Sequence, residues 1–142
     1  STNPGESLKP LKNVVSGGEL SRIMLAIKTC LANKDAIETL IFDEIDTGIS
    51  GEIGRIVGIK LNNIASFGQI LCITHLPQVA CYGDEFYYVF KQEINNSTQT
   101  GIKNLKGEEI IKNLAKMVVG DEVTETTLKQ AMEMREKAGK CV

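Results

Sequence analysis

The sequence has no apolar run that approaches the roughly 20 residues needed to cross a bilayer, and no signal-peptide pattern opens it. It also has no excess of one charge, because acidic and basic residues are interspersed and the net charge is −2. We therefore expect a cytosolic chain with no membrane partner. A surface that tracked nucleic acid throughout would normally be basic, so any DNA contact should be local or made by other parts of a protein.

Paired cysteines are absent as well, since the four cysteines are widely spaced and form no CxxC motif. One set, Cys72, His75 and Cys81, could be imagined as metal ligands, but zinc signatures usually have tighter pairs. Cys30 and Cys72 lie in apolar periodic segments, where a reduced thiol behaves as a small hydrophobic group. A structural interpretation of these cysteines is favoured.

The composition is that of a soluble globular protein. The chain has 142 residues, of which 42% are apolar and 24% charged, enough for one domain or one lobe of a larger one. Residues 1–13, with Pro4, Gly5 and Pro10, are expected to form an extended leading segment. A motif follows almost at once, so we expect the chain to begin in the middle of a longer protein.

A helix is predicted to begin at Ser16-Gly17-Gly18-Glu19, because a serine followed three residues later by a glutamate is a capping box. Apolar residues then recur at helical spacing until Asn33-Lys34-Asp35 breaks the pattern. These residues are Leu20, Ile23, Met24, Ile27 and Leu31.

Two short apolar runs, Thr39–Phe42 and Gln69–Thr74, are predicted as buried parallel strands. A helix between them carries an apolar face made of Ile53, Ile56, Val57, Leu61 and Ile64. Strand, helix and strand form a βαβ unit, whose parallel strands end at the same edge of the sheet. Asp43 and Glu44 leave one strand at that edge and His75 leaves the other, so these side chains are expected to converge.

The C-terminal part is predicted to hold a hairpin and two helices. One strand spans Phe86–Phe90, a turn is expected near Asn95-Asn96, and a second strand passes Gly101 to about Leu105. Helices follow over 108–118 and 124–137, the last with Leu128, Ala131, Met132 and Arg135 at helical spacing. The predicted fold class is α/β, a parallel-strand core with flanking helices plus a C-terminal hairpin and helices.

Three groups of residues suggest chemistry on phosphates. Asp43 can hold Mg²⁺ and Glu44 can polarise a water, although strand ends often carry solvated acids. The Ser16–Glu19 turn offers backbone N–H groups and a positive helix end to an anion, although it also suits an ordinary capped helix. His75 could donate a hydrogen bond to a terminal phosphate, although a lone histidine is more often structural.

Taken together, three segments resemble the motifs of ABC-type ATPases. They are VVSGGELSR (14–22), similar to the signature motif, LIFDEIDTGIS (40–50), similar to Walker B with the D-loop, and CITHLPQVA (72–80), similar to the His-switch. Ile45-Asp46 stands where transporter subunits usually have Pro-Thr, which resembles the SMC-like branch. STNPGE (1–6) and GDEVTETTL (120–128) extend the resemblance to a bacterial DNA-repair family within that branch.

The resemblance implies that two copies of the head sandwich two ATP molecules with Mg²⁺. It implies a γ-phosphate contact, made to the nucleotide held by the partner, for Ser16, Gly17, Gly18 and Glu19. It further implies that Asp43 positions Mg²⁺, that Glu44 is the general base and that His75 contacts the γ-phosphate. A D-loop that crosses the dimer interface is implied for Thr47, Gly48 and Ser50, although many D-loops have Asp where Ser50 stands.

A larger departure is that GxxxxGK[ST], the loop that cradles the β- and γ-phosphates, occurs nowhere in the chain. The resembled family places this Walker A loop in an N-terminal lobe of the same protein, beyond a long coiled coil. We therefore expect residues 1–142 to be the C-terminal lobe of a partial P-loop NTPase head, inactive alone. Within it, 14–92 would form the signature, Walker B and His-switch core, and 93–142 the hairpin and terminal helices.

The implied function is an ATPase head in recombinational repair of DNA double-strand breaks, bacterial, cytoplasmic and associated with the nucleoid. DNA would be bound through the full-length protein. One alternative is a nucleotide-dependent dimerisation module with incidental turnover. Another is a transporter ATP-binding subunit, which Asp46 disfavours and which upstream coiled-coil heptads would exclude.

Overall fold

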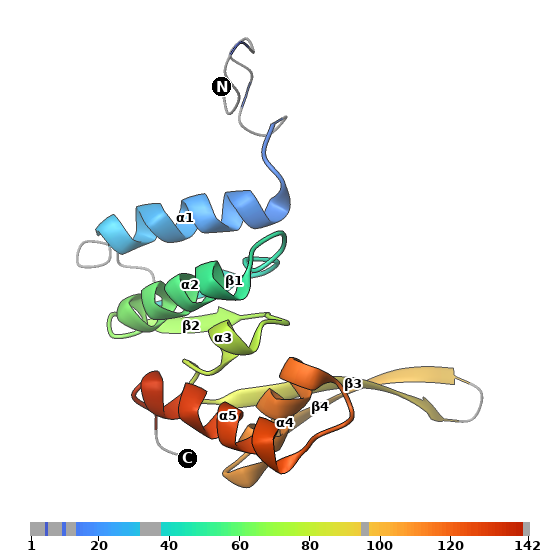
Figure 1. The fold of residues 1–142 in the computed structure, drawn as a ribbon. Helices are drawn as coiled ribbons and strands as arrows, with labels where there is room; N and C mark the ends of the chain where they lie inside the picture. The colour runs from blue at the N-terminus through green and yellow to red at the C-terminus, as the bar shows by residue number, and fades with distance from the viewer. Residues whose placement is uncertain (1–4, 6–9, 11–13, 32–37, 95–96, 141–142) are drawn as a thin grey trace. The chain divides into compact units, whose positions relative to one another are not determined.

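The computed structural model describes residues 5, 10, 14–31, 38–94 and 97–140, which form two compact units, one up to Thr74 and one from His75 (Figure 1). Three sequence predictions lie outside the described residues: the helix break at Asn33–Asp35, the hairpin turn at Asn95-Asn96, and most of the leading segment 1–13. Among the described residues, no helix combines the length and apolar character of a membrane span.

The first unit contains the predicted βαβ arrangement. It consists of helix α1 (Gly17–Leu31), strand β1 (Thr39–Phe42), helix α2 (Gly51–Ile64) and strand β2 (Gln69–Cys72). The two strands pair in parallel from Thr39 opposite Gln69 to Phe42 opposite Cys72, which confirms the predicted pairing. β2 ends two residues before the predicted end at Thr74. The N–H of Ile73 still donates to the carbonyl of Phe42 at 2.9 Å, so the strands end at one edge.

Only some of the apolar side chains of this unit are buried in its core. The buried apolar side chains are Leu25, Phe42, Ile45, Val57, Leu61 and Ile64. The prediction that both strands are buried was wrong, because Ile41 is 68% and Ile73 61% exposed. The pair has no further strand beside it in the described residues, so its outer edges and much of its faces stay uncovered.

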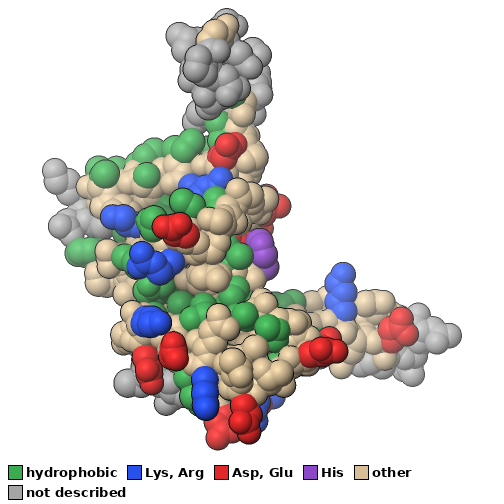
Figure 2. All heavy atoms as spheres, viewed as in Figure 1, with side chains coloured by type: hydrophobic (Ala, Val, Ile, Leu, Met, Phe, Trp, Pro, Cys, Tyr) green, Lys and Arg blue, Asp and Glu red, His purple; other side chains and the backbone are tan. Residues whose placement is uncertain are grey.

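Helix α1 also exposes its predicted apolar stripe. Leu20, Ile23, Met24, Ile27 and Leu31 are all exposed. Figure 2 shows hydrophobic side chains in green along this helix. Leu25 on another face is the buried apolar residue of this helix. Two residues of the α2 face, Ile53 and Ile56, are exposed as well. Apolar residues at helical spacing therefore predicted the helices correctly but did not predict what covers them.

The second unit contains the predicted hairpin and helices. It consists of a short helix α3 (Pro77–Ala80), strands β3 (Phe86–Ile94) and β4 (Ser97–Leu105), and helices α4 (Glu108–Val119) and α5 (Glu125–Lys137). β3 and β4 pair antiparallel, from Phe86 opposite Leu105 to Ile94 opposite Ser97. The first strand is therefore four residues longer than predicted. Thr124 caps α5 through a reciprocal bond pattern with Thr127.

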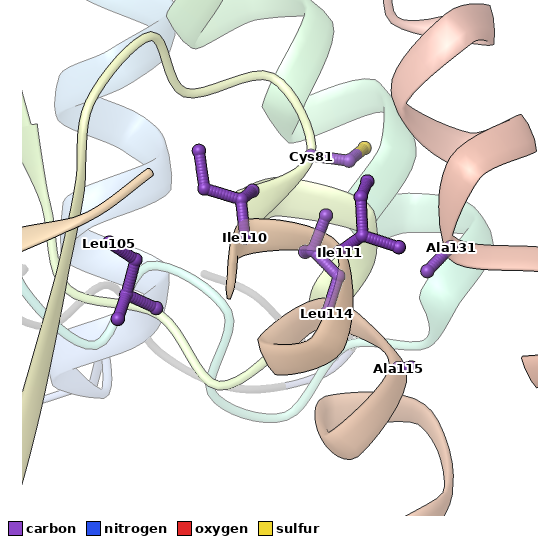
Figure 3. Close-up of a cluster of buried hydrophobic side chains, with 7 residues drawn as sticks. All are labelled: Cys81, Leu105, Ile110, Ile111, Leu114, Ala115 and Ala131. Carbon is purple, nitrogen blue, oxygen red and sulfur yellow. The ribbon is translucent and has the colours of Figure 1, made fainter. Parts of the chain in front are cut away.

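The core of the second unit lies where α3, the base of the hairpin and the two terminal helices meet. Figure 3 shows its buried side chains, which are Cys81, Leu105, Ile110, Ile111, Leu114, Ala115 and Ala131. Leu114 and Ala131 are fully buried and belong to α4 and α5 respectively. Burial raises the pKa of the Cys81 thiol to about 11, although Arg135 opposes this effect.

Arg135, predicted from its spacing to lie on the apolar face of α5, is a buried residue with a polar role. Its guanidinium donates to the carbonyls of Cys81, at 3.1 Å, and Gly83, at 2.6 Å, and lies 5.2 Å from the centre of the Phe86 ring. It thereby fixes the loop that follows α3 to the last helix. Lys140 adds an ion pair of 2.6 Å with Asp84 in the same loop.

Candidate active site

The candidate site is built around the two acids that follow β1. Asp43 and Glu44 are both exposed, and Asp43 accepts a hydrogen bond of 2.9 Å from the N–H of Glu44 through its Oδ1. Because β1 and β2 are parallel, this turn stands at the edge where both strands end. Open α/β sheets bind ligands at this kind of edge.

Glu44 has an unusual backbone conformation. Its φ is 55°, and among the described residues it is the non-glycine residue that lies in the left-handed region. A side chain there brings Cβ close to the following carbonyl and costs about 1–2 kcal/mol. The N–H of Thr47 closes a turn onto the carbonyl of Glu44 at 3.0 Å. Such strain persists only where neighbouring contacts hold it, so the residues that surround this turn must stabilise it.

The Ser16–Glu19 turn forms the predicted capping box. Glu19 Oε2 accepts from the N–H and the hydroxyl of Ser16, both at 2.9 Å, and the Glu19 N–H donates to Ser16 Oγ at 3.4 Å. The hydrogen bonds from Ser16 hold the pKa of the exposed Glu19 carboxyl below its ordinary value, with a smaller contribution from Arg22. Ser16 is exposed, so its hydroxyl is accessible but already bonded to Glu19.

The two glycines bring this turn against the acidic turn of the same chain. A side-chain carbon on Gly17 would lie 2.6 Å from Glu44 Oε2. One on Gly18 would lie 2.7 Å from the carbonyl oxygen of Glu44 and 3.0 Å from that of Thr47. Gly18 is buried by this contact, whereas Ser16 and Gly17 are exposed. The close approach of the acidic turn's backbone therefore requires glycine at position 18, whereas Gly17 faces the end of the Glu44 side chain.

Two side chains of α1, which were not predicted as site residues, bind the backbone of the acidic turn. Ser21 donates from its hydroxyl to the carbonyl of Asp43 at 2.8 Å. Arg22 donates from one guanidinium nitrogen to the carbonyls of Ile45, at 3.0 Å, and Thr47, at 2.9 Å. Their place in the SGGELSR segment was the one signal the sequence offered, because contacts from a side chain to a distant carbonyl leave no local pattern.

Asp46 is a third residue whose place in the site was not predicted. It is only 2% exposed, and its Oδ2 accepts a short hydrogen bond from the hydroxyl of Thr74. Nearby, burial raises the pKa of the Cys72 thiol to about 12, with smaller contributions from the carboxylates of Asp46 and Asp43. Asp46 thus links the acidic turn to the end of the segment that follows β2.

The predicted D-loop residues lie between this turn and α2. Gly48 has a φ of 73°, which glycine adopts readily, and Thr47 and Ser50 are exposed. Ser50 occupies the N-cap of α2 with an extended backbone, and its carbonyl accepts the N–H of Gly54 at 2.8 Å. This segment runs along the surface of the first unit, from the acidic turn to α2.

His75 is the first residue of the second unit, exposed, and two residues before Pro77 begins α3. Its convergence with Asp43 and Glu44 stays a prediction, because they belong to the other unit. The structure does bring together Ser16, Gly17, Gly18, Asp43 and Glu44 within the first unit.

The donor set suits Mg²⁺ rather than a metal held by protein ligands alone. No group of three or more His, Cys, Asp or Glu side chains that could hold a metal ion occurs in the described part of the chain. Mg²⁺ commonly uses one or two carboxylates together with phosphate oxygens and waters. The exposed Asp43 carboxylate at the end of β1 fits this requirement.

Curated proteins similar to this chain are DNA repair proteins. "DNA repair protein RecN" of Halalkalibacterium halodurans is 46% identical over 138 residues, which are 97% of this chain and 24% of the relative. The proteins of the same name from Bacillus subtilis and Haemophilus influenzae are 43% and 45% identical over 97% and 94% of this chain. The chain thus spans about a quarter of the length of these relatives. No protein-family model matches it.

Solved structures share the fold, and one of them serves as an example. It comes from work described as "Structural biochemistry of ATP-driven dimerization and DNA stimulated activation of SMC ATPases", with a TM-score of 0.52 and 18% identity. The match covers 80% of this chain and 68% of that one. The α/β fold class expected from the sequence is therefore confirmed.

Proposed function

The chain belongs to the RecN family of DNA repair proteins, and on this premise we propose that it is the C-terminal lobe of an ATP-hydrolysing, SMC-like head. In the full-length protein this head would act in recombinational repair of DNA double-strand breaks in the bacterial cytoplasm, at the nucleoid. Two heads would enclose ATP between them, and hydrolysis would release them. DNA would be bound through the full-length protein.

The observation that carries this proposal is the meeting of two motifs at one sheet edge. The acidic pair Asp43 and Glu44 follows β1 where both parallel strands end. The glycine turn that begins α1 lies directly against Glu44. Among the described residues, the backbone N–H groups of Gly17 and Gly18 have no hydrogen-bond acceptor, as the first turn of a helix usually leaves them. Such a turn can bind a phosphate.

In this proposal each site residue has a separate task. The Glu44 carboxylate accepts a proton from the attacking water through Oε1 or Oε2. The Ser16 hydroxyl and the N–H groups of Gly17 and Gly18 bind the γ-phosphate of the nucleotide held by the partner head. To do so, Ser16 must turn its proton from Glu19 Oε2 to the phosphate. His75 contacts the γ-phosphate, and residues 47–50 cross the interface between the heads.

Asp43 would hold Mg²⁺, which when bound neutralises charge on the phosphates. The N–H of Glu44 donates to Oδ1 of Asp43, which orients the Asp43 carboxylate and leaves the Glu44 side chain unconstrained by this bond. The assignment of Asp43 to the metal and of Glu44 to the water rests on the resemblance of the LIFDEIDTGIS segment to Walker B.

The exposed apolar surfaces support the proposal that a second lobe covers this one. The strand pair has uncovered edges in the described residues, and the α1 stripe is exposed over its whole length. Contiguous exposed apolar surface commonly marks an interface. An N-terminal lobe with the Walker A loop would add strands beside β1 and β2 and supply the phosphate cradle that this chain lacks.

Replacing Glu44 by Gln in the full-length protein tests the function. Glu44→Gln should keep ATP binding and reduce turnover by about 100-fold or more, because general base catalysis contributes roughly 10²–10⁴-fold. Closed dimers should then accumulate with ATP, measured by light scattering alongside a phosphate-release assay. Glu52→Gln, an exposed glutamate in the first turn of α2, is the matched control and should turn over normally.

The same experiment separates the alternative functions. A dimerisation module with incidental turnover would lose hydrolysis in Glu44→Gln and still release its dimers and repair DNA as the unmodified protein does. Unchanged phosphate release in Glu44→Gln would refute the assignment of the base. The transporter alternative is disfavoured by the family to which the chain belongs.

A further inference from the structure

Resting on the proposed function, we propose that Arg22 is a positioning residue that holds the Glu44 backbone in the conformation its carboxylate needs. Arg22 lies on α1, six residues after the proposed phosphate-binding Ser16, and is half-buried. Its side chain reaches neither ATP nor the attacking water in this proposal. It acts through the turn from Asp43 to Thr47.

The geometry of Arg22 is specific to this turn. One guanidinium nitrogen donates to two carbonyls that stand two residues apart, those of Ile45 and Thr47, at 3.0 and 2.9 Å. A single donor group thus fixes the Ile45–Asp46 and Thr47–Gly48 peptide planes, both of which lie after Glu44. Arginine suits this task because its planar guanidinium carries several N–H donors and no acceptor, and it stays charged at any pH the protein meets.

Other contacts from α1 complete the same arrangement. Ser21 binds the carbonyl of Asp43 from its hydroxyl at 2.8 Å, before Glu44, while Arg22 binds the carbonyls after it. The backbone of Gly18 packs against the carbonyls of Glu44 and Thr47, and Arg22 lies 3.1 Å from where a Gly18 side-chain carbon would stand. The left-handed Glu44 is therefore held on both sides by one helix.

Loss of these bonds should release the turn rather than unfold the helix. Without Arg22, the carbonyls of Ile45 and Thr47 can turn to water, and Glu44 can relax from φ 55° to an ordinary backbone conformation. Its carboxylate then moves away from the water it must polarise. The bond from Ser21 still holds the carbonyl of Asp43, and Ser16 and Gly17 take no part in the lost bonds, so turnover should fall more than ATP affinity.

The test compares three variants of the full-length protein. Arg22→Ala should lower kcat for ATP hydrolysis by roughly 10- to 100-fold, the loss typical of a group displaced by about 1 Å, with KM changed less than about threefold. Arg22→Lys should recover part of the rate, because an ammonium keeps the charge and has donors for the carbonyls but does not hold them in the fixed planar geometry of a guanidinium. Arg55→Ala, an exposed arginine of α2, is the matched control and should keep the parent kcat.

A second measurement separates positioning from general destabilisation. ATP binding and the thermal midpoint should be kept in Arg22→Ala and Arg22→Lys, as in Arg55→Ala. An unchanged kcat in Arg22→Ala would overturn the inference, and so would equal losses of kcat, ATP binding and thermal stability. If Arg22→Ala yields no folded protein, Arg22→Lys carries the test on the same criteria.

Glu44→Gln is measured beside these variants so that two kinds of failure can be told apart. If Glu44→Gln stalls hydrolysis and Arg22→Ala does not slow it, the proposed function stands and the role of Arg22 is wrong. If Glu44→Gln hydrolyses ATP at the parent rate, the assignment of the base fails, and the role of Arg22 fails with it.

Discussion

Gly17 and Gly18 are neighbours in sequence but face different kinds of atoms. The nearest atom to a side chain on Gly17 is Oε2, at the far end of the Glu44 side chain, which can rotate away. The nearest atoms to one on Gly18 are two backbone carbonyl oxygens, which can move only if the turn moves. Alanine should therefore have different effects at the two positions.

We expect Gly18→Ala to destabilise the protein by about 1–3 kcal/mol, the usual cost of forcing extra atoms into a packed site. Gly17→Ala should be neutral or slightly stabilising, since alanine favours a helix over glycine by up to about 1 kcal/mol, but should displace the Glu44 carboxylate and slow hydrolysis. Denaturant unfolding and phosphate release on the full-length variants measure both effects. Equal stability losses for the two alanines would show that the close approach to the backbone is unimportant.

Residues with local patterns were predicted well from the sequence, and residues with distant contacts were not. The spacing of Ser16 and Glu19 predicted a capping box because both partners lie in one helical turn. Arg22 and Thr74 bind groups 23 and 28 residues away in the sequence. A single sequence contains no local signal for such bonds, so their roles emerged only from the structure.

At the scale of elements, the order and pairing of helices and strands follow from the apolar pattern, whereas burial does not. Thr39–Phe42 and Gln69–Cys72 pair in parallel because a helix connects them, as predicted. Their predicted burial was wrong because burial depends on the surfaces that cover a sheet, and the described first unit covers only part of this pair. Phe42 is 3% exposed, whereas Ile41 beside it is 68% exposed. The same reason explains the exposed face of α1.

The terminal helices show the opposite case, because their core is complete within one unit. Leu114 of α4 is fully buried against α5 and the hairpin base, whereas Met132 of α5 is 39% exposed. Leu114→Ala should therefore destabilise the protein by about 2–5 kcal/mol, the range for large-to-small changes in a core. Met132→Ala is the control and should cost less than about 1 kcal/mol.

Chemical denaturation of the two variants, followed by far-ultraviolet circular dichroism, measures this difference. A Leu114→Ala variant as stable as Met132→Ala would mean that α4 does not depend on its contact with α5 and the hairpin base. We expect the larger loss of stability for Leu114→Ala because the Leu114 side chain is fully buried and that of Met132 is partly exposed.

For the whole molecule, the exposed apolar surfaces and the absence of a phosphate loop both support the proposal that a second lobe covers this one. The chain spans about a quarter of its curated relatives and contains no GxxxxGK[ST]. The absence of the contiguous motif can be read directly from the sequence, whereas the role of the chain as one lobe of a head stays a prediction. The position of His75 relative to the acidic pair could not be predicted in the same way, because it depends on how two units are arranged.

The isolated chain should therefore neither bind ATP tightly nor hydrolyse it. Without the Walker A backbone and lysine, the β- and γ-phosphates have no cradle on this lobe. Isothermal titration with ATP and Mg²⁺ should show no binding at micromolar concentrations, whereas the full-length protein should bind. Tight Mg²⁺-dependent binding by the 142-residue chain would contradict the assignment of this chain as one lobe of a divided site.

The left-handed glutamate at the acidic turn has a consequence for laboratory evolution of this protein. Glycine tolerates that backbone without a steric penalty, so a library screened for heat resistance alone should drift to glycine at position 44. A library screened for survival of DNA breaks should keep the acid. Under the proposed function, selection for thermal stability should therefore favour glycine at position 44, whereas selection for repair should favour glutamate.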